Sequence, residues 1–150
     1  MIELVTTISA SLDVCFDLSR DIDLHLSSMR ESGERAIAGK TAGLIGPGEE
    51  VTWQARHFGL LHTHRSRITS YDRPRHFRDI MVEGRFTLFE HDHYFEPMER
   101  GTRMRDVITF ASPFGLLGWL VDRMFLTRYL TVLIERRNHT IREVAERRAK

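Results

Sequence analysis

The 150-residue sequence has a single cysteine, four prolines and almost no net charge, and these shortages exclude several classes of protein. One cysteine cannot form an intramolecular disulfide, so a disulfide-stapled scaffold is excluded. The formal charge is +1, from 22 basic and 21 acidic side chains, which argues against a nucleic-acid-binding protein. With 41% hydrophobic and 29% charged residues, the chain is neither disordered nor fibrous in composition, and we expect one domain over residues 1–150.

The sequence also lacks recognisable targeting and membrane segments. Residues 1–4 show neither the basic nor the apolar region of a signal peptide. The most apolar stretch, residues 114–134, is interrupted by Asp122, Arg123 and Arg128, which would be costly inside a bilayer. We therefore expect no integral membrane segment, no nucleic-acid partner and a cytoplasmic location.

The first third of the chain predicts one strand followed by two short helices. Residues 2–8 are rich in β-branched side chains and predict a strand. A short helix is expected to end at Leu18. Asp21 can cap a second helix over 22–30, which Gly33 would close.

Turn residues divide the middle of the chain into six predicted strands. Glycine and proline at 43–48, Gly59, Pro74, Gly84 and Gly101 mark the connections. The strands are expected at 35–38, 51–58, 60–71, 76–82, 86–95 and 102–110. From Phe114 onward, apolar residues recur three and four positions apart, which predicts one long C-terminal helix.

This order of elements resembles that of the START-like, or SRPBCC, superfamily. The motifs that carry the resemblance are GEEVTWQARHFG at 48–59, FEHDHYF at 89–95, TRMRD at 102–106 and SPFG at 112–115. They are similar to the bacterial members described as polyketide cyclase/dehydrase-like. The resemblance implies an α+β helix-grip fold, in which a curved antiparallel sheet of about seven strands surrounds a long C-terminal helix and encloses a cavity. It implies no particular catalytic residue, because the superfamily mixes ligand carriers, cyclases and hydrolases.

Histidines are concentrated in the predicted strands, with six of the eight between positions 57 and 93. Successive side chains of a strand point to opposite faces, so the strands that line a cavity contribute every second residue to it. On this basis the inner surface comprises Trp53, His57, Phe77, Asp79, Met81, Phe89, His91, His93, Thr102, Met104 and Asp106. The other three histidines of the cluster, His62, His64 and His76, are expected at the surface or in turns.

The polar residues of this inner surface have three interpretations. Histidines and aspartates could pair with one another and hold the sheet in register. They could orient the polar group of a ligand in a mainly apolar pocket. They could instead bind a metal ion through His91, Asp92 and His93 with His57, Asp79 or Asp106, since imidazoles two positions apart on a strand face the same way. A zinc site needs three or four converging ligands and the sequence brings only two together, so we expect no metal and no cofactor.

We expect the chain to bind a small hydrophobic or amphipathic molecule, with His91, His93, Asp79 and Asp106 at its polar end. One alternative is a cyclase, dehydrase or hydrolase that acts on a bound carbonyl compound through a histidine base and an aspartate partner. Another is a non-enzymatic accessory or regulatory module. Ligand binding predicts an enclosed cavity, an enzyme adds a His–Asp pair inside it, and an accessory module predicts a filled core with an exposed apolar patch.

The start of the predicted C-terminal helix, residues 114–120, is apolar on more than one side. Such excess apolar surface could line the mouth of the cavity, contact a second subunit in a homodimer or touch a membrane. We expect Trp119 and Phe125 to border the cavity or its entrance.

Overall fold

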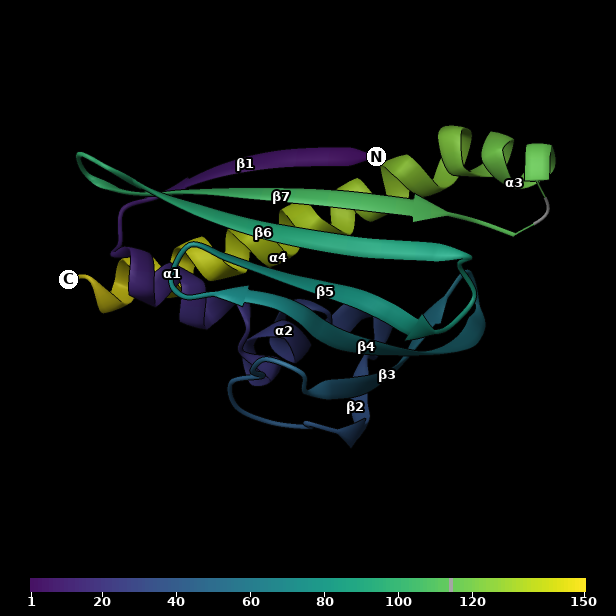
Figure 1. Ribbon diagram of the computed structural model, residues 1–150, viewed down its shortest axis with the longest axis horizontal. Helices are drawn as coiled ribbons and strands as arrows, with labels where there is room; N and C mark the ends of the chain where they lie inside the picture. The colour runs from purple at the N-terminus through teal and green to yellow at the C-terminus, as the bar shows by residue number, and fades with distance from the viewer. Residues whose placement is uncertain (114) are drawn as a thin grey trace.

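Seven strands form one antiparallel sheet in the computed structural model, which describes residues 1–113 and 115–150. The sheet order is β1-β7-β6-β5-β4-β3-β2, so β2 to β7 follow one another as neighbours and β1 lies beside β7 (Figure 1). The strands are β1 (Ile2–Ile8), β2 (Arg35–Gly39), β3 (Glu50–His57), β4 (Leu60–Asp72), β5 (His76–Glu83), β6 (Leu88–Met98) and β7 (Gly101–Ala111). All six predicted strands of the middle region are present, and most are longer than predicted by a residue or more.

Two short helices, α1 (Leu12–Ser19) and α2 (Ile22–Ser28), connect β1 to the rest of the sheet. The Asp21 carboxylate caps α2, because it accepts hydrogen bonds from the backbone N–H groups of Asp23 and Leu24 at 2.9 and 3.1 Å. The α-helix ends at Ser28, earlier than the predicted 22–30, and a short 3-10 turn at Arg30–Ser32 follows it.

The C-terminal helix is divided into three parts. They are α3 (Gly115–Val121), a π-helical segment (Asp122–Leu126) and α4 (Thr127–Arg148), whereas the sequence pattern predicted one uninterrupted helix. The Asp122 carboxylate accepts hydrogen bonds from the backbone N–H and the hydroxyl of Ser112, and the Thr127 hydroxyl donates to the Asp122 carbonyl oxygen at 2.7 Å. The charge within the apolar stretch therefore ties the helix to the end of β7. The predicted helix start, Phe114, lies outside the described residues.

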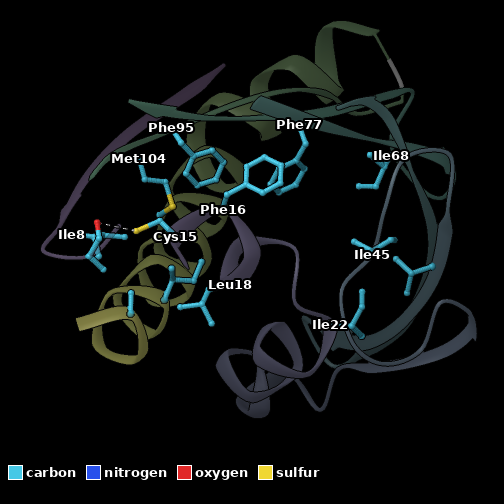
Figure 2. Close-up of a cluster of buried hydrophobic side chains, with 14 of the residues drawn as sticks. Ile8, Cys15, Phe16, Leu18, Ile22, Ile45, Ile68, Phe77, Phe95 and Met104 are labelled. Carbon is cyan, nitrogen blue, oxygen red and sulfur yellow. Dashed lines mark hydrogen bonds between the residues drawn. The ribbon is translucent and has the colours of Figure 1, made fainter. Parts of the chain in front are cut away.

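Helix α4 crosses one face of the curved sheet, and α3 extends beyond the end of the strands (Figure 1). Phe16 of α1 is fully buried and makes edge-to-face contacts with Tyr71, Phe77 and Phe95, with ring centroids 5.3 to 5.4 Å apart. Figure 2 shows Phe16, Phe77 and Phe95 packed together, with Ile45 lying apart from them. A second, smaller cluster of Ile2, Ile108 and Phe110 packs against the first half of the C-terminal helix.

These features confirm the predicted α+β architecture, with a curved antiparallel sheet, two short helices after the first strand and a long C-terminal helix. In the part of the chain that the structure describes, no helix combines the length and hydrophobicity that crossing a membrane requires.

Replacing the aromatic ring at the centre of the core is expected to destabilise the protein strongly. Phe16→Ala removes a fully buried ring and leaves a cavity among three aromatic neighbours, so we expect the free energy of unfolding to fall by about 3–5 kcal/mol. Urea denaturation followed by circular dichroism measures the change. Val5→Ala, at a residue that is 57% exposed, is the control, and a Phe16→Ala variant as stable as this control would contradict the packing described here.

Candidate ligand-binding site

A cavity of about 730 Å³ lies between the sheet and the C-terminal helix. Its volume is within the range of about 300–1,000 Å³ that is typical of small-molecule sites. Most of its wall is apolar, and it includes Ile45, Val51, Ile68, Phe86, Leu126, Leu130 and Ile134. The exposed residues Phe58, Arg85, Leu117 and Val121 also line it, so these residues mark its mouth.

The alternation of side chains along the strands places most of the predicted inner residues on the cavity wall. In β3, Val51, Trp53 and Ala55 are buried while the residues between them are less so. The predicted residues that line the cavity are Trp53, His57, Phe77, Asp79, Met81, Phe89, His91 and His93.

Three predicted residues of β7 face the interior but do not line the cavity. Thr102 and Met104 are fully buried beneath α1, where the Thr102 hydroxyl donates to the Ala10 carbonyl at 2.9 Å and the Ser19 hydroxyl lies 3.4 Å from the Met104 sulfur. Asp106 lies in contact with the two inner histidines of β6, away from the open space. The prediction missed this because α1 fills the end of the interior next to β6 and β7.

The structure does not place Trp119 and Phe125 on the cavity wall. Their side chains are 57% and 63% exposed, and Leu117, Gly118 and Val121 line the cavity instead. These three positions are spaced as one face of a helix, so the indole of Trp119 projects from a different face of α3.

His62 and His64 line the cavity, so their predicted place at the surface was wrong. Strand β3 pairs with β4 so that Trp53 lies opposite His64 and Ala55 lies opposite His62. Paired residues in an antiparallel sheet share a face, which makes both histidines face inward. The tight turn at Gly59 fixes this pairing. Counting residue pairs outward from the turn would have shown that His62 and His64 face inward.

His76 is on the opposite, outer face of the sheet. Its Nε2 lies 2.7 Å from the carboxylate of Asp92, and Arg78 Nε donates to the same carboxylate at 2.8 Å. Asp92 therefore belongs to an outer network and points away from its sequence neighbours His91 and His93.

The floor of the cavity carries a buried network of histidines and aspartates. His91 Nε2 donates to Asp106 Oδ1 at 2.8 Å, and His93 Nε2 donates to Asp79 Oδ2 at 3.1 Å. His93 Nδ1 lies 2.9 Å from Asp106 Oδ1 but at an angle that makes no hydrogen bond. The His93 ring also stacks on Phe77, with centroids 4.1 Å apart. The structure thus brings together four of the residues predicted to form the polar end of the site.

Helix α4 adds two polar residues to this network that sequence reasoning missed. Asn138 Nδ2 donates to Asp106 Oδ2 at 2.7 Å, and Arg137 Nη1 lies 3.6 Å from Asp106 Oδ1. Arg137 is only 5% exposed, although charged residues of helices usually face solvent, and it also donates to the Ser19 carbonyl at 2.7 Å. Its spacing from Ile134 and Ile141, three and four positions, was the signal for an inward position.

Burial and hydrogen bonding set the charges of the floor. Burial raises the pKa of Asp106, but the His91 hydrogen bond and interactions with both histidines hold it well below its usual range. Burial also raises the pKa of Asp79, but the His93 hydrogen bond together with charge interactions with the two histidines and Arg137 lowers it overall. Burial lowers the pKa of His91 to about 4, so its imidazole is neutral at pH 7. The two carboxylates of the floor face one guanidinium, that of Arg137.

A second polar group lies along the wall formed by β3 and β4. His57 Nδ1 and the Tyr129 hydroxyl of α4 are 2.6 Å apart, and His25 Nε2 donates to the Glu34 carboxylate at 3.1 Å. Burial raises the pKa of Glu34, but the His25 hydrogen bond and nearby histidines lower it overall. Burial is also the main cause that lowers the pKa of His64. Glu34 and Tyr129 were not identified from the sequence, because only the folded chain brings them to this wall.

Comparisons with known proteins give likenesses of structure and none of sequence. No protein-family model matches the chain, and no curated protein matches it significantly. The protein TTHA0849 of Thermus thermophilus is similar in structure, with a TM-score of 0.72, 17% identity and coverage of 93% of this chain and 95% of that protein. A START superfamily protein of Mycobacterium smegmatis has a TM-score of 0.72 at 11% identity, over 97% of each chain.

A polyketide-pathway protein shows the same architecture. The di-domain ARO/CYC StfQ, from the steffimycin biosynthetic pathway, superimposes with a TM-score of 0.79 at 16% identity. The match covers 99% of this chain and 51% of StfQ, so the chain spans about half of that di-domain protein. The chain has the START-like, helix-grip fold, as the resemblance in its sequence implied.

The buried histidine of β4 is expected to make stability depend on pH. Because the pKa of His64 is lowered in the folded state, the unfolded chain binds its proton more readily as the pH falls below about 6.5. Stability should therefore decrease between pH 7 and pH 5, and it should decrease less in a His64→Phe variant, which has no group to protonate there. Urea denaturation at the two pH values measures both losses, and equal losses in the two proteins would contradict this assignment.

Proposed function

We propose that the chain binds a small, mainly apolar molecule with one polar end in the cavity between the sheet and α4. The observation that carries this proposal is a cavity of about 730 Å³ whose wall is mostly apolar and whose charged groups gather at its floor. Small-molecule sites have this composition, since apolar walls supply affinity and a few polar groups fix orientation.

The floor supplies both kinds of polar partner that such an end would need. Asp79 retains 22% of its side-chain surface and accepts hydrogen bonds, and the imidazoles of His91 and His93 lie beside it. Their remaining hydrogen-bonding capacity faces an apolar cavity, where an unsatisfied polar group costs free energy, which a ligand hydroxyl group would offset. The solved ARO/CYC with this fold supports a ligand of polyketide-like size and chemistry. A cytoplasmic location and a homodimer stay predictions.

A second candidate function is acid–base catalysis on the bound molecule, as in a cyclase, dehydrase or hydrolase. It is favoured by His–Asp pairs within hydrogen-bond distance at the cavity floor, at 2.8 and 3.1 Å. A carboxylate partner fixes the tautomer of an imidazole and makes it a better base, and His91, whose Nε2 donates to Asp106, lines the cavity and keeps Nδ1 as a proton acceptor. Proton abstraction beside a carbonyl group of the ligand is the reaction that this arrangement suits.

Filling the cavity is expected to prevent binding. Ser66 of β4 lines the cavity and is 8% exposed, so Ser66→Phe should project a ring into the open space. Steric overlap of about 1–3 kcal/mol between this ring and the ligand, the scale typical of overpacking, corresponds to roughly 5–150-fold weaker binding. A fluorescence titration with the apolar dye Nile red, together with native mass spectrometry of the purified chain, measures occupancy before and after the substitution.

Thr69→Phe, at an exposed position of the same strand, is the matched control and should leave dye binding unchanged. Equal dye affinity in the two variants would show that the dye does not occupy the cavity and would contradict the proposal. If denaturing extraction of the wild-type chain releases a stoichiometric organic molecule, its conversion by the wild type and by His91→Gln tests the catalytic alternative.

A further inference from the structure

We propose that Asp79, His91 and His93 form a binding site for a divalent transition-metal ion at the floor of the cavity. One candidate ligand atom from each residue lies within 4.8 Å of the other two. The sheet fixes this arrangement, because Asp79 of β5 is paired with His91 of β6 and His93 follows two positions later on the same face. Three ligands on two neighbouring strands therefore converge without help from a flexible loop.

The distances suit an ion at the centre of the group. His93 Nε2 and Asp79 Oδ2 are 3.1 Å apart. Two atoms at this separation, each about 2.1 Å from a shared ion, subtend an angle of about 95° at it, close to octahedral geometry and not far from tetrahedral. All the candidate ligand atoms lie within 4.8 Å of one another, and two atoms that share an ion at about 2.1 Å can be at most about 4.2 Å apart, so a movement of at most about 0.6 Å brings any pair within range.

Asp106 occupies the place of an outer-shell carboxylate for both histidines. Asp106 accepts a hydrogen bond from His91 Nε2 at 2.8 Å, so His91 Nδ1 is the nitrogen left to bind an ion. Asp106 also lies 2.9 Å from His93 Nδ1, so His93 Nε2 is the nitrogen left to bind the same ion. Histidines that bind metals characteristically direct their second ring nitrogen to a carboxylate in this way. His93 Nδ1 is buried without a well-formed hydrogen bond. An ion on Nε2 would replace the proton that Nε2 donates to Asp79, and the one proton of the neutral ring would then sit on Nδ1, where it can be donated to Asp106.

Charge and access also fit a cation. The floor carries two carboxylates against one guanidinium, and Arg137 is directed to Asp106 and the Ser19 carbonyl. All three proposed ligands line the cavity, so an ion held by them would keep open coordination positions toward the ligand space. Two imidazoles and one carboxylate with open positions suit Zn²⁺, Fe²⁺ or Co²⁺ rather than Mg²⁺ or Ca²⁺.

This proposal revises the sequence-based expectation of no metal. That expectation rested on His91 and His93 being the only two ligands that the sequence placed together, and the pairing of β5 with β6 supplies Asp79 as the third. The metal site does not depend on the proposed organic ligand, and the following test is made without one.

Metal binding is measured on the full chain, without an affinity tag and after treatment with a chelator. We expect isothermal titration calorimetry to show one Zn²⁺ per chain, Co²⁺ to give visible absorption bands from imidazole and carboxylate coordination, and Mg²⁺ not to bind. Asp106→Asn, which changes an outer-shell residue, should weaken Zn²⁺ binding by roughly 10–100-fold. Asp79→Asn and His93→Gln, which change proposed ligands, should weaken Zn²⁺ binding by more than Asp106→Asn does.

His62→Gln is the matched control, because His62 lines the same cavity outside the proposed triad and should leave Zn²⁺ affinity unchanged. Circular dichroism establishes that each variant folds. For wild type, added Zn²⁺ should raise the unfolding temperature, a readout that needs no variant. The proposal is overturned if the wild type binds neither Zn²⁺ nor Co²⁺ stoichiometrically, or if Asp79→Asn and His93→Gln bind as tightly as His62→Gln. Nile red binding by the same metal-free chain reports separately on the cavity.

Discussion

Asp106 is the buried charge on which both the fold and the cavity floor depend. Its side chain is completely inaccessible, and it joins β7 to His91 of β6 and to Asn138 of α4. A buried carboxylate is tolerated only when its oxygens are hydrogen-bonded and its charge is offset, which fixes where these partners can lie. The position of α4 across the sheet therefore follows partly from apolar packing and partly from the need to bring Asn138 and Arg137 to this one carboxylate.

Strand β6 shows how the same constraint fixes the register of the sheet. His91 and His93 reach the inner network, while Asp92 between them binds His76 and Arg78 on the outer face. A slip of one residue would bury Asp92 and move both histidines to the outer face, which leaves both networks without partners. Polar pairing thus specifies the register in a strand whose apolar residues alone would specify it weakly.

The extent to which the sequence predicted the structure depended on how local each signal is. Turn residues and alternation are local signals, so the order of strands along the chain and the inward position of His91 and His93 could be predicted. His64 was missed because its direction follows from pairing with Trp53 across a hairpin. Arg137 was missed because a charged residue on a helix usually faces solvent, and only the buried carboxylate opposite explains its inward position.

Packing differs between the floor and the mouth of the cavity, and this difference suits the proposed ligand binding. The floor is held by buried hydrogen bonds among three elements, whereas the mouth is lined by exposed apolar residues such as Phe58 and Leu117. Helix α3 lies beyond the end of the sheet and is tied to it by the hydrogen bonds between Ser112 and Asp122 (Figure 1). Segments with few buried apolar contacts open at low free-energy cost. The mouth can therefore open while the Asp106 network keeps the polar floor in place, as the proposed ligand binding requires.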